Sequence, residues 1–85
     1  MRKVEIGWPD DNEDGERIEM MAVREAKGYR FKFRLKSEEE WTWLKGPTLA
    51  QAEKLHDILD QRYRRRRASY KEVQIAERLV KSLGG

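Results

Sequence analysis

Apolar and polar residues alternate with a period of two near the start of the chain. Val4, Ile6 and Trp8 are separated by a charged residue and a glycine. Successive side chains of a β-strand point to opposite faces, so this alternation predicts a half-buried strand. We expect Pro9 to end that strand. Residues 10–15 are mostly acidic and close with Asp-Gly, which predicts a loop.

The clearest strand covers residues 29–35, where aromatic or aliphatic residues alternate strictly with Arg and Lys. Residues 16–26 before it are ambiguous. Their Glu, Arg, Met and Ala content favours a helix, whereas Ile18, Met20 and Ala22 are spaced by two, as in a strand. A Lys-Gly pair between the two segments is typical of a two-residue hairpin turn, which favours the strand.

A hairpin with Lys27-Gly28 as its turn satisfies both faces of the strand pair. It places acidic residues opposite basic ones; the predicted pairs are Glu25 with Arg30 and Glu19 with Lys36. It also places the apolar residues of both strands on a single face. We therefore predict a strand, and not a helix, over residues 16–26.

Two helices are predicted in the second half of the chain. Thr48 and Gln51 have the spacing of a capping box, and an amphipathic stripe of apolar residues predicts a helix to about Arg66. Ser69 and Glu72 repeat the capping signal, so a second helix is predicted there. One long helix through the arginine-rich segment is the alternative, because the residues between the two are good helix formers.

A fourth strand is predicted at residues 40–45, just before a Gly-Pro break. The elements then form an α+β fold, in which a four-stranded antiparallel meander is followed by two C-terminal α-helices packed on one sheet face. With 85 residues, the chain is expected to be a single small domain with a sheet region at 1–47 and a helical region at 48–85.

The predicted core joins one sheet face to the apolar stripes of the helices. Its members are Val4, Ile6, Trp8, Ile18, Met20, Tyr29, Phe31, Phe33, Leu35, Leu55, Ile58, Leu59, Val73, Ala76, Leu79 and Val80. The other sheet face is predicted to carry Met21, Val23, Arg30, Lys32, Arg34 and Lys36, with either the Trp41/Trp43 pair or the Thr42/Leu44 pair.

Composition removes several classes of function. The chain has no cysteine, which excludes disulfides, thiol catalysis and cysteine-rich zinc sites. No apolar run approaches the roughly 18 residues that span a bilayer, and Glu5 interrupts any apolar signal-peptide core. We therefore expect a cytoplasmic protein with no membrane partner.

The net charge of +3 is unevenly placed along the chain. Residues 1–47 carry 10 basic and 11 acidic side chains, whereas residues 48–85 carry 9 basic and 5 acidic ones. The excess includes a run without acidic residues, formed by Arg62, Arg64, Arg65, Arg66, Arg67 and Lys71. Arginine binds phosphate through paired hydrogen bonds, so this basic helical patch is the first candidate site for nucleic acid or an acidic partner. One or two cations are enough to stabilise a helix C-terminus, whereas four consecutive arginines would place charge all around the helix.

A second basic set lies on the clearest strand: Arg30, Lys32, Arg34 and Lys36. Alternate positions of a strand are about 6–7 Å apart, a spacing similar to that of phosphates in a nucleic-acid strand, and Trp41 or Trp43 could stack on bases if it pointed outward. The structural alternative is that Glu19 and Glu25 neutralise two of the four, or that the cations protect a sheet edge.

The acidic loop offers a candidate metal site. Asp10, Asn12, Asp14 and the following glycine resemble the first half of the calcium loop of the EF-hand family, in which alternate oxygen side chains converge on one cation. The chain departs from that pattern, because Met21 occupies the position of the bidentate acid and the loop follows a strand. The other interpretation is a solvated hairpin loop.

Catalysis is not expected. His56 is the single histidine, and Asp60 is its possible partner at helical spacing. The chain has no serine in a nucleophile motif, no glycine-rich phosphate loop and no His-Glu-x-x-His metal motif. We therefore predict no enzymatic activity, no cofactor and no small-molecule substrate.

Two functions remain. The first is a small nucleic-acid-binding or regulatory protein that contacts phosphates through the basic patch. The second is a protein-interaction module, acting as an adaptor, an inhibitor or a homodimer, that uses an exposed surface of Trp41, Trp43, Met21 and arginine. The size and charge are also compatible with a phage or mobile-element accessory protein.

Overall fold

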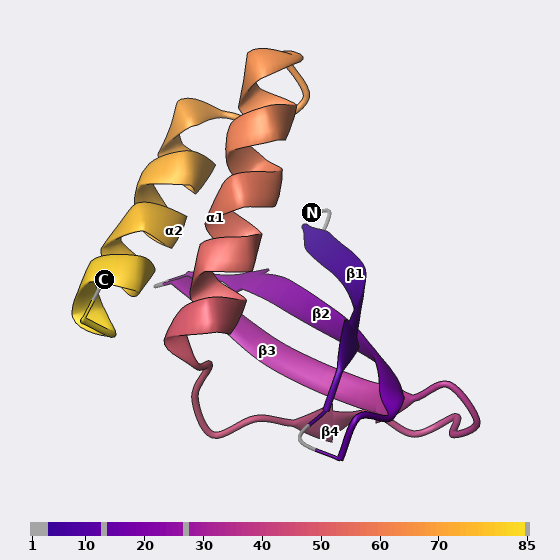
Figure 1. Cartoon of the computed structure of the whole chain (residues 1–85). Coiled ribbons are helices and arrows are strands. Elements are labelled where there is room, and N and C mark those ends of the chain that lie inside the picture. The colour runs from indigo at the N-terminus through magenta and orange to yellow at the C-terminus, as the bar shows by residue number, and fades with distance from the viewer. Residues whose placement is uncertain (1–3, 13, 27, 85) are drawn as a thin grey trace. The chain divides into compact units, whose positions relative to one another are not determined.

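Figure 1 shows a computed structural model of the chain, which describes residues 4–12, 14–26 and 28–84. Four strands and two helices follow one another: β1 (Glu5–Asp11), β2 (Arg17–Glu25), β3 (Gly28–Leu35), β4 (Thr42–Trp43), α1 (Leu49–Arg64) and α2 (Tyr70–Ser82). The strands form one antiparallel sheet in the order β1-β2-β3-β4. The predicted α+β fold, a four-stranded meander followed by two helices, is confirmed.

The chain divides into two compact units. We call Met1–Gly46 the sheet unit and Pro47–Gly85 the helical unit. The packing of the helices on one sheet face and the organisation as a single domain both stay predictions.

Strand β1 is longer than expected. It continues through Pro9 to Asp11, so the prediction that Pro9 ends the strand is wrong. Pro9 lies opposite Glu19 of β2, and β1 is an edge strand of the sheet. An edge strand tolerates proline because its backbone N–H groups need a partner on one side only.

Strand β2 is confirmed, but its register with β3 differs from the prediction by two residues. Glu25 lies opposite Gly28, and Glu19 lies opposite Arg34. Lys27 of the predicted turn lies outside the described residues. Side chains alternate between faces with a period of two, so a shift of two residues changes the partners but keeps every side chain on its predicted face.

Strand β4 is shorter than predicted. Only Thr42–Trp43 are paired as strand, opposite Phe33 and Lys32 of β3. The backbone N–H of Leu44 donates a further hydrogen bond, 2.9 Å long, to the Phe31 carbonyl. With so few backbone hydrogen bonds, β4 depends on its side chains to stay against β3.

The helices begin where the capping signals predict. The Thr48 side chain accepts from the Gln51 backbone N–H, and the Gln51 side chain accepts from the Thr48 N–H, which completes the capping box. At Ser69 the structure shows the first half of the motif, a 3.4 Å hydrogen bond from the Glu72 N–H. Two helices are therefore confirmed over one long helix.

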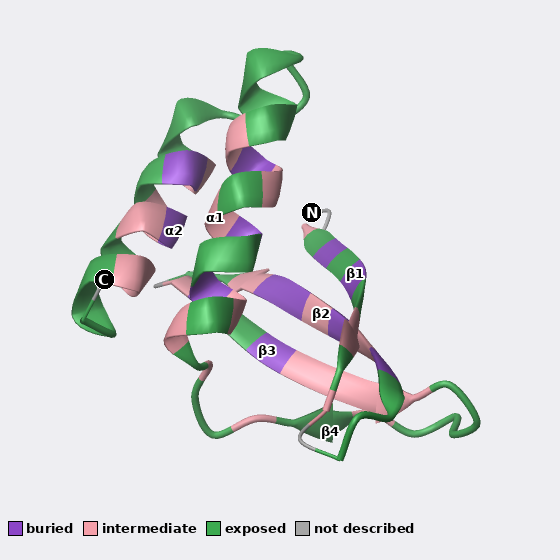
Figure 2. Cartoon of the chain, viewed as in Figure 1, coloured by how far each residue is buried: buried purple, intermediate pink, exposed green. Residues whose placement is uncertain are grey.

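Figure 2 maps burial onto these elements. Most of the predicted core is buried: Ile6, Trp8, Ile18, Met20, Tyr29, Phe31, Leu55, Leu59, Val73 and Ala76. The remaining predicted members are half-buried: Val4, Phe33, Leu35, Ile58, Leu79 and Val80. The prediction for Val23 is wrong in one respect. Val23 is predicted to lie on the sheet face opposite the core, but it is only 5% exposed. It lies between Glu5 and Arg30 on the neighbouring strands.

Candidate nucleic-acid interface

The basic run of the sequence lies in the turn that separates α1 from α2. The N–H of Arg66 donates to the Tyr63 carbonyl over 2.9 Å, and the N–H of Arg67 donates to the Arg62 carbonyl over 2.7 Å. These two bonds are the Schellman motif, which satisfies the last carbonyls of a helix. We call the basic residues of this segment the arginine turn: Arg62, Arg64, Arg65, Arg66 and Arg67.

The arginine turn is less helical than predicted. Helix α1 ends at Arg64 and Arg65 is its C-terminal cap, so the four consecutive arginines do not place charge around a helix. They begin on its last turn and leave it along the connecting backbone. The helix stops because the Schellman hydrogen bonds redirect the chain and Ser69 begins α2 at once.

Arg66 occupies a backbone conformation that is unusual for an arginine. Its φ of 61° lies in the left-handed region, at the position of the motif where glycine is usual. A residue with a Cβ atom costs about 1 kcal/mol there. The chain therefore has a long cation where a glycine would be more stable.

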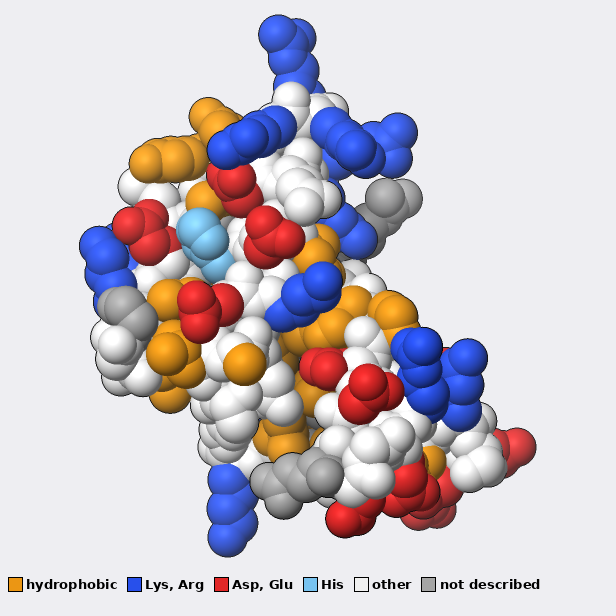
Figure 3. All heavy atoms as spheres, in the orientation of Figure 1, with side chains coloured by type: hydrophobic (Ala, Val, Ile, Leu, Met, Phe, Trp, Pro, Cys, Tyr) orange, Lys and Arg blue, Asp and Glu red, His pale blue; other side chains and the backbone are white. Residues whose placement is uncertain are grey.

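The arginine turn is exposed and poorly neutralised. All its residues are exposed, and Figure 3 shows Lys and Arg side chains gathered at this end of the helical unit. Arg64 pairs with Asp60 at 3.2 Å, with 76% of the Arg64 side chain exposed. Within the part of the chain that the structure describes, the other arginines of the turn have no carboxylate partner. Their positive charge remains available to an anion.

Three of these arginines line one recess. It has a volume of about 510 Å³ and is lined by Ile58, Gln61, Arg62, Arg65 and Arg67. The lining combines cations, an amide donor and one aliphatic side chain. Arginines that line one space suit the oxygens of a phosphate group, since each guanidinium can form two parallel hydrogen bonds. Lys71, the remaining residue of the predicted patch, is exposed in the first turn of α2.

Two tyrosines accompany the arginine turn, and sequence reasoning did not single them out: Tyr63 lies between Arg62 and Arg64, and Tyr70 follows the turn. The rings of Tyr63 and Tyr70 lie 5.4 Å apart between centroids and are tilted by 45°. Their exposed fractions are 43% and 54%. The signal that could have found them is a tyrosine next to a basic residue at each end of the turn.

The second basic set lies on β3 beside the tryptophans of β4. The sequence left open whether Trp41 and Trp43, or Thr42 and Leu44, share the sheet face of these cations. Trp43 lies opposite Lys32, so the face carries the Trp41/Trp43 pair. Cations and rings alternate along it: Arg30 is 4.1 Å from the centroid of Trp43, Lys32 is 5.0 and 5.1 Å from Trp41 and Trp43, and Arg34 is 4.7 Å from Trp41. We call these five residues the Trp–cation ladder.

The arginines of this ladder also have carboxylate partners. Arg30 Nε lies 3.3 Å from Glu25 Oε1, and Arg34 lies 3.2 Å from Glu19 Oε2. The sequence left open that Glu19 and Glu25 neutralise two of the four cations, and these ion pairs show that they do. Glu25 pairs with Arg30 as predicted, whereas Glu19 pairs with Arg34 and not with Lys36. Lys36 lies in the turn after β3 and is exposed. Each ladder arginine is thus held by a ring and a carboxylate, and has less capacity left for phosphate.

The residues predicted for a protein-binding surface share this face. Met21 lies opposite Lys32, which lies opposite Trp43. Met21 and Trp41 are half-buried, whereas Trp43 is 44% exposed. The sheet therefore brings the predicted partner residues together, with Trp43 the most accessible of them.

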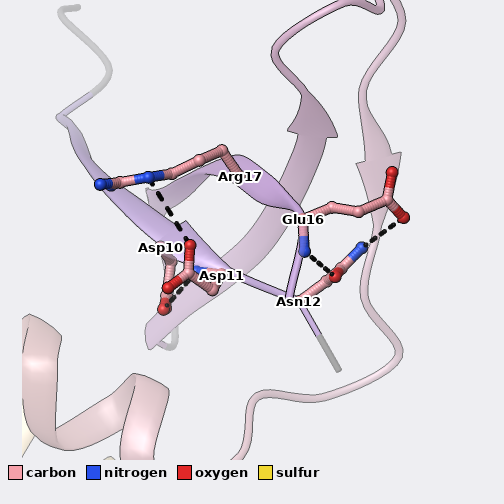
Figure 4. A network of polar contacts seen from close by, with 5 residues as sticks. All are labelled: Asp10, Asp11, Asn12, Glu16 and Arg17. Atoms are coloured by element: carbon pink, nitrogen blue, oxygen red, sulfur yellow. Dashed lines mark hydrogen bonds and ion pairs between the residues drawn. The ribbon is translucent and has the colours of Figure 1, made fainter. Parts of the chain in front are cut away.

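In the loop that resembles a calcium site, the side chains of Asp10 and Asn12 accept hydrogen bonds from the backbone of the hairpin between β1 and β2 (Figure 4). Asn12 Oδ1 accepts from the N–H groups of Asp14 and Glu16, at 3.0 and 2.8 Å, and Gly15 turns the chain with a φ of 80°. Asp10 accepts from the N–H of the next residue over 2.8 Å. Over the described ranges 4–12, 14–26 and 28–84, no three His, Cys, Asp or Glu residues gather in a way that could hold a metal ion.

His56 lies half-buried on α1. Its possible partner, Asp60, instead pairs with Arg64. The prediction that the protein is not an enzyme stays a prediction.

None of the described helices is both long and apolar enough to cross a membrane. Comparison with protein-family models, with curated proteins and with solved structures finds no match to this chain.

Proposed function

We propose that this protein is a small, non-enzymatic nucleic-acid-binding protein whose arginine turn contacts phosphates. The observation that carries the proposal is the left-handed conformation of Arg66. Strained residues often mark functional positions, and here the strain places one more cation at the apex of an exposed basic turn. A glycine would close the helix equally well without it.

The charge distribution around the turn supports the same conclusion. Arg64 has a partner in Asp60, but Arg62, Arg65 and Arg67 surround a recess that suits phosphate oxygens. Contacts of this kind supply affinity without reading the base sequence. The Trp–cation ladder is not included in the proposed interface, because its arginines are already engaged by Glu19 and Glu25.

A salt titration tests the proposal. Binding of a fluorescein-labelled oligonucleotide is measured by fluorescence anisotropy over a range of NaCl concentrations. Because each phosphate contact contributes about −0.7 to −0.9 to the slope of log K against log salt, about four contacts give a slope near −3. Binding that does not weaken as salt rises, or no binding at all, would contradict the proposal.

The variant Arg66→Gly is expected to have opposite effects on stability and on binding. Removal of the left-handed arginine is expected to raise the free energy of unfolding by about 1 kcal/mol. Removal of one phosphate contact is expected to reduce the salt slope by about 1 and to weaken binding. Urea unfolding and fluorescence anisotropy measure the two effects.

Arg78→Gln is the matched control, because it removes one exposed positive charge from α2 about 12 Å along the helix from its first residue. It is expected to leave both stability and the salt slope nearly unchanged. Equal loss of binding in the two variants would show that only net charge matters and that the turn has no special role.

The alternative function, a protein-interaction module, has one supporting observation in the 44% exposure of Trp43 beside Met21 and Lys32. Analytical ultracentrifugation of the purified chain tests the homodimer form. A concentration-dependent dimer that Trp43→Ser abolishes would favour the sheet face as the functional surface. A strict monomer would leave the arginine turn as the better candidate.

A further inference from the structure

The two tyrosines beside the arginine turn are more exposed than their contact with each other requires. Tyr63 lies in the last turn of α1, and Tyr70 is the first residue of α2. Their contact spans the turn, as expected of an aromatic pair that joins two helices. About half of the surface of each residue nevertheless remains accessible, at 43% and 54%.

The neighbours of these tyrosines are basic or small. Tyr63 stands between Arg62 and Arg64, and Tyr70 between Ser69 and Lys71. Exposed rings and cations therefore belong to one continuous stretch of chain, folded at the Schellman turn. This surface combines flat apolar faces with a positive field, and a ligand complementary to it has flat rings attached to a chain of negative charges.

We infer that the arginine turn binds single-stranded nucleic acid, with bases stacked on Tyr63 and Tyr70 while the arginines hold the phosphates; this inference rests on the proposed function. Base–aromatic stacking together with a basic surface is the usual means of binding single strands. In a duplex the base faces are already stacked on each other, so a duplex could use the arginines but not the tyrosines.

The observations also argue against an acidic protein segment as the occupant. Carboxylate side chains would satisfy the guanidinium groups but would leave the tyrosine faces uncovered. Single-stranded nucleic acid uses both parts of the surface, because every nucleotide supplies one phosphate and one ring. The turn reads no base sequence in this arrangement, since every base has a face that can stack.

The experiment compares four labelled probes of equal length, about 12 nucleotides or residues, a length that suits one small binding surface. They are oligodeoxyadenylate, the corresponding duplex, an abasic phosphodiester oligomer and polyglutamate. Anisotropy titrations at one low salt concentration are expected to rank oligodeoxyadenylate first. Its affinity is expected to exceed that for the abasic oligomer by about tenfold or more, given the usual effect of stacking.

Variants assign this preference to the tyrosines. Tyr70→Leu, and separately Tyr63→Leu, is expected to weaken oligodeoxyadenylate binding by about tenfold, with no change for the abasic oligomer or in the salt slope. Tyr70→Phe and Tyr63→Phe keep the ring and are expected to retain binding. Far-ultraviolet circular dichroism confirms that each variant is folded, and Tyr70→Leu, at the more exposed position, remains informative if Tyr63→Leu unfolds.

The outcomes separate this inference from the proposed function. Equal, salt-dependent binding of the abasic oligomer and oligodeoxyadenylate would overturn the stacking and leave the phosphate contacts intact. Tighter binding of the duplex than of the single strand would also overturn the inference alone. Failure to bind any nucleic-acid probe, or tighter binding of polyglutamate than of all of them, would overturn both.

Discussion

The molecule has two sets of clustered cations, which differ in how many of their members have carboxylate or ring partners. In the Trp–cation ladder, Arg30 and Arg34 each contact a tryptophan ring and a glutamate. In the arginine turn, the one ion pair among the described residues is Arg64 with Asp60, and the segment around it is exposed. The arginines of the first set contact rings and carboxylates of the sheet unit, whereas the second set is exposed to solvent.

The difference arises from the secondary structure that carries each set. Strand β3 lies between β2 and β4, so the cations along it meet side chains of adjacent strands at close range. A turn between two helices has no such neighbours. Two basic sets in the sequence thus become a surface with paired arginines in one place and an exposed, mostly unpaired one in the other.

The largest expected effect comes from a matched pair of double variants. Arg65→Gln with Arg67→Gln removes two guanidinium groups from the recess and is expected to weaken oligonucleotide binding by about a hundredfold, or about 2.7 kcal/mol. Arg30→Gln with Arg34→Gln removes equal charge from the ladder and is expected to change binding by about twofold or less. Anisotropy titrations of folded samples measure both. Similar losses in the two double variants would contradict the proposed difference between the arginine turn and the ladder.

A double-mutant cycle tests the structural role of the ladder. Arg30→Met and Trp43→Leu remove the cation and the ring of its closest contact, and urea unfolding of the single and double variants gives their coupling. We expect about 1 kcal/mol, because the guanidinium lies over the ring at 4.1 Å. The same cycle on Arg64 and Asp60, an exposed i,i+4 pair, is expected to give only about 0.4 kcal/mol. A coupling near zero for Arg30 and Trp43 would mean that the ladder is not a stabilising element.

The smallest expected effect comes from releasing one cation in each set. Asp60→Asn frees Arg64, and Glu19→Gln frees Arg34. Both variants raise the net charge by one. Asp60→Asn is expected to tighten oligonucleotide binding by about twofold, or about 0.4 kcal/mol, and Glu19→Gln to leave it unchanged. If both tighten binding equally, the gain reflects net charge, and the two regions are not distinguished by this test.

Local signals in the sequence were enough for the element order. The capping residues Thr48 and Ser69 located both helices, because a cap acts on backbone groups within a few residues. The paired faces of β2 and β3 were correct although the register was shifted by two residues. Alternation determines which face a side chain occupies, whereas the partner it meets depends on the geometry of the hairpin.

Where the prediction failed, the cause was non-local. Pro9 remains in β1 because the strand is at an edge, and Val23 is buried on a face that its pattern assigns to charged residues. Each of these outcomes depends on what lies around a residue in space, which its sequence neighbours do not specify.

The sequence by itself determined the α+β order, the helix starts and the presence of two basic sets, because periodicity and capping are properties of neighbouring residues. Only the tertiary structure decided which basic set is neutralised. Glu19 is 15 positions from Arg34 along the chain and reaches it through the sheet, whereas the Schellman turn carries Arg66 away from any carboxylate partner among the described residues. Ion pairs and ring contacts depend on distance in space, and folding sets that distance.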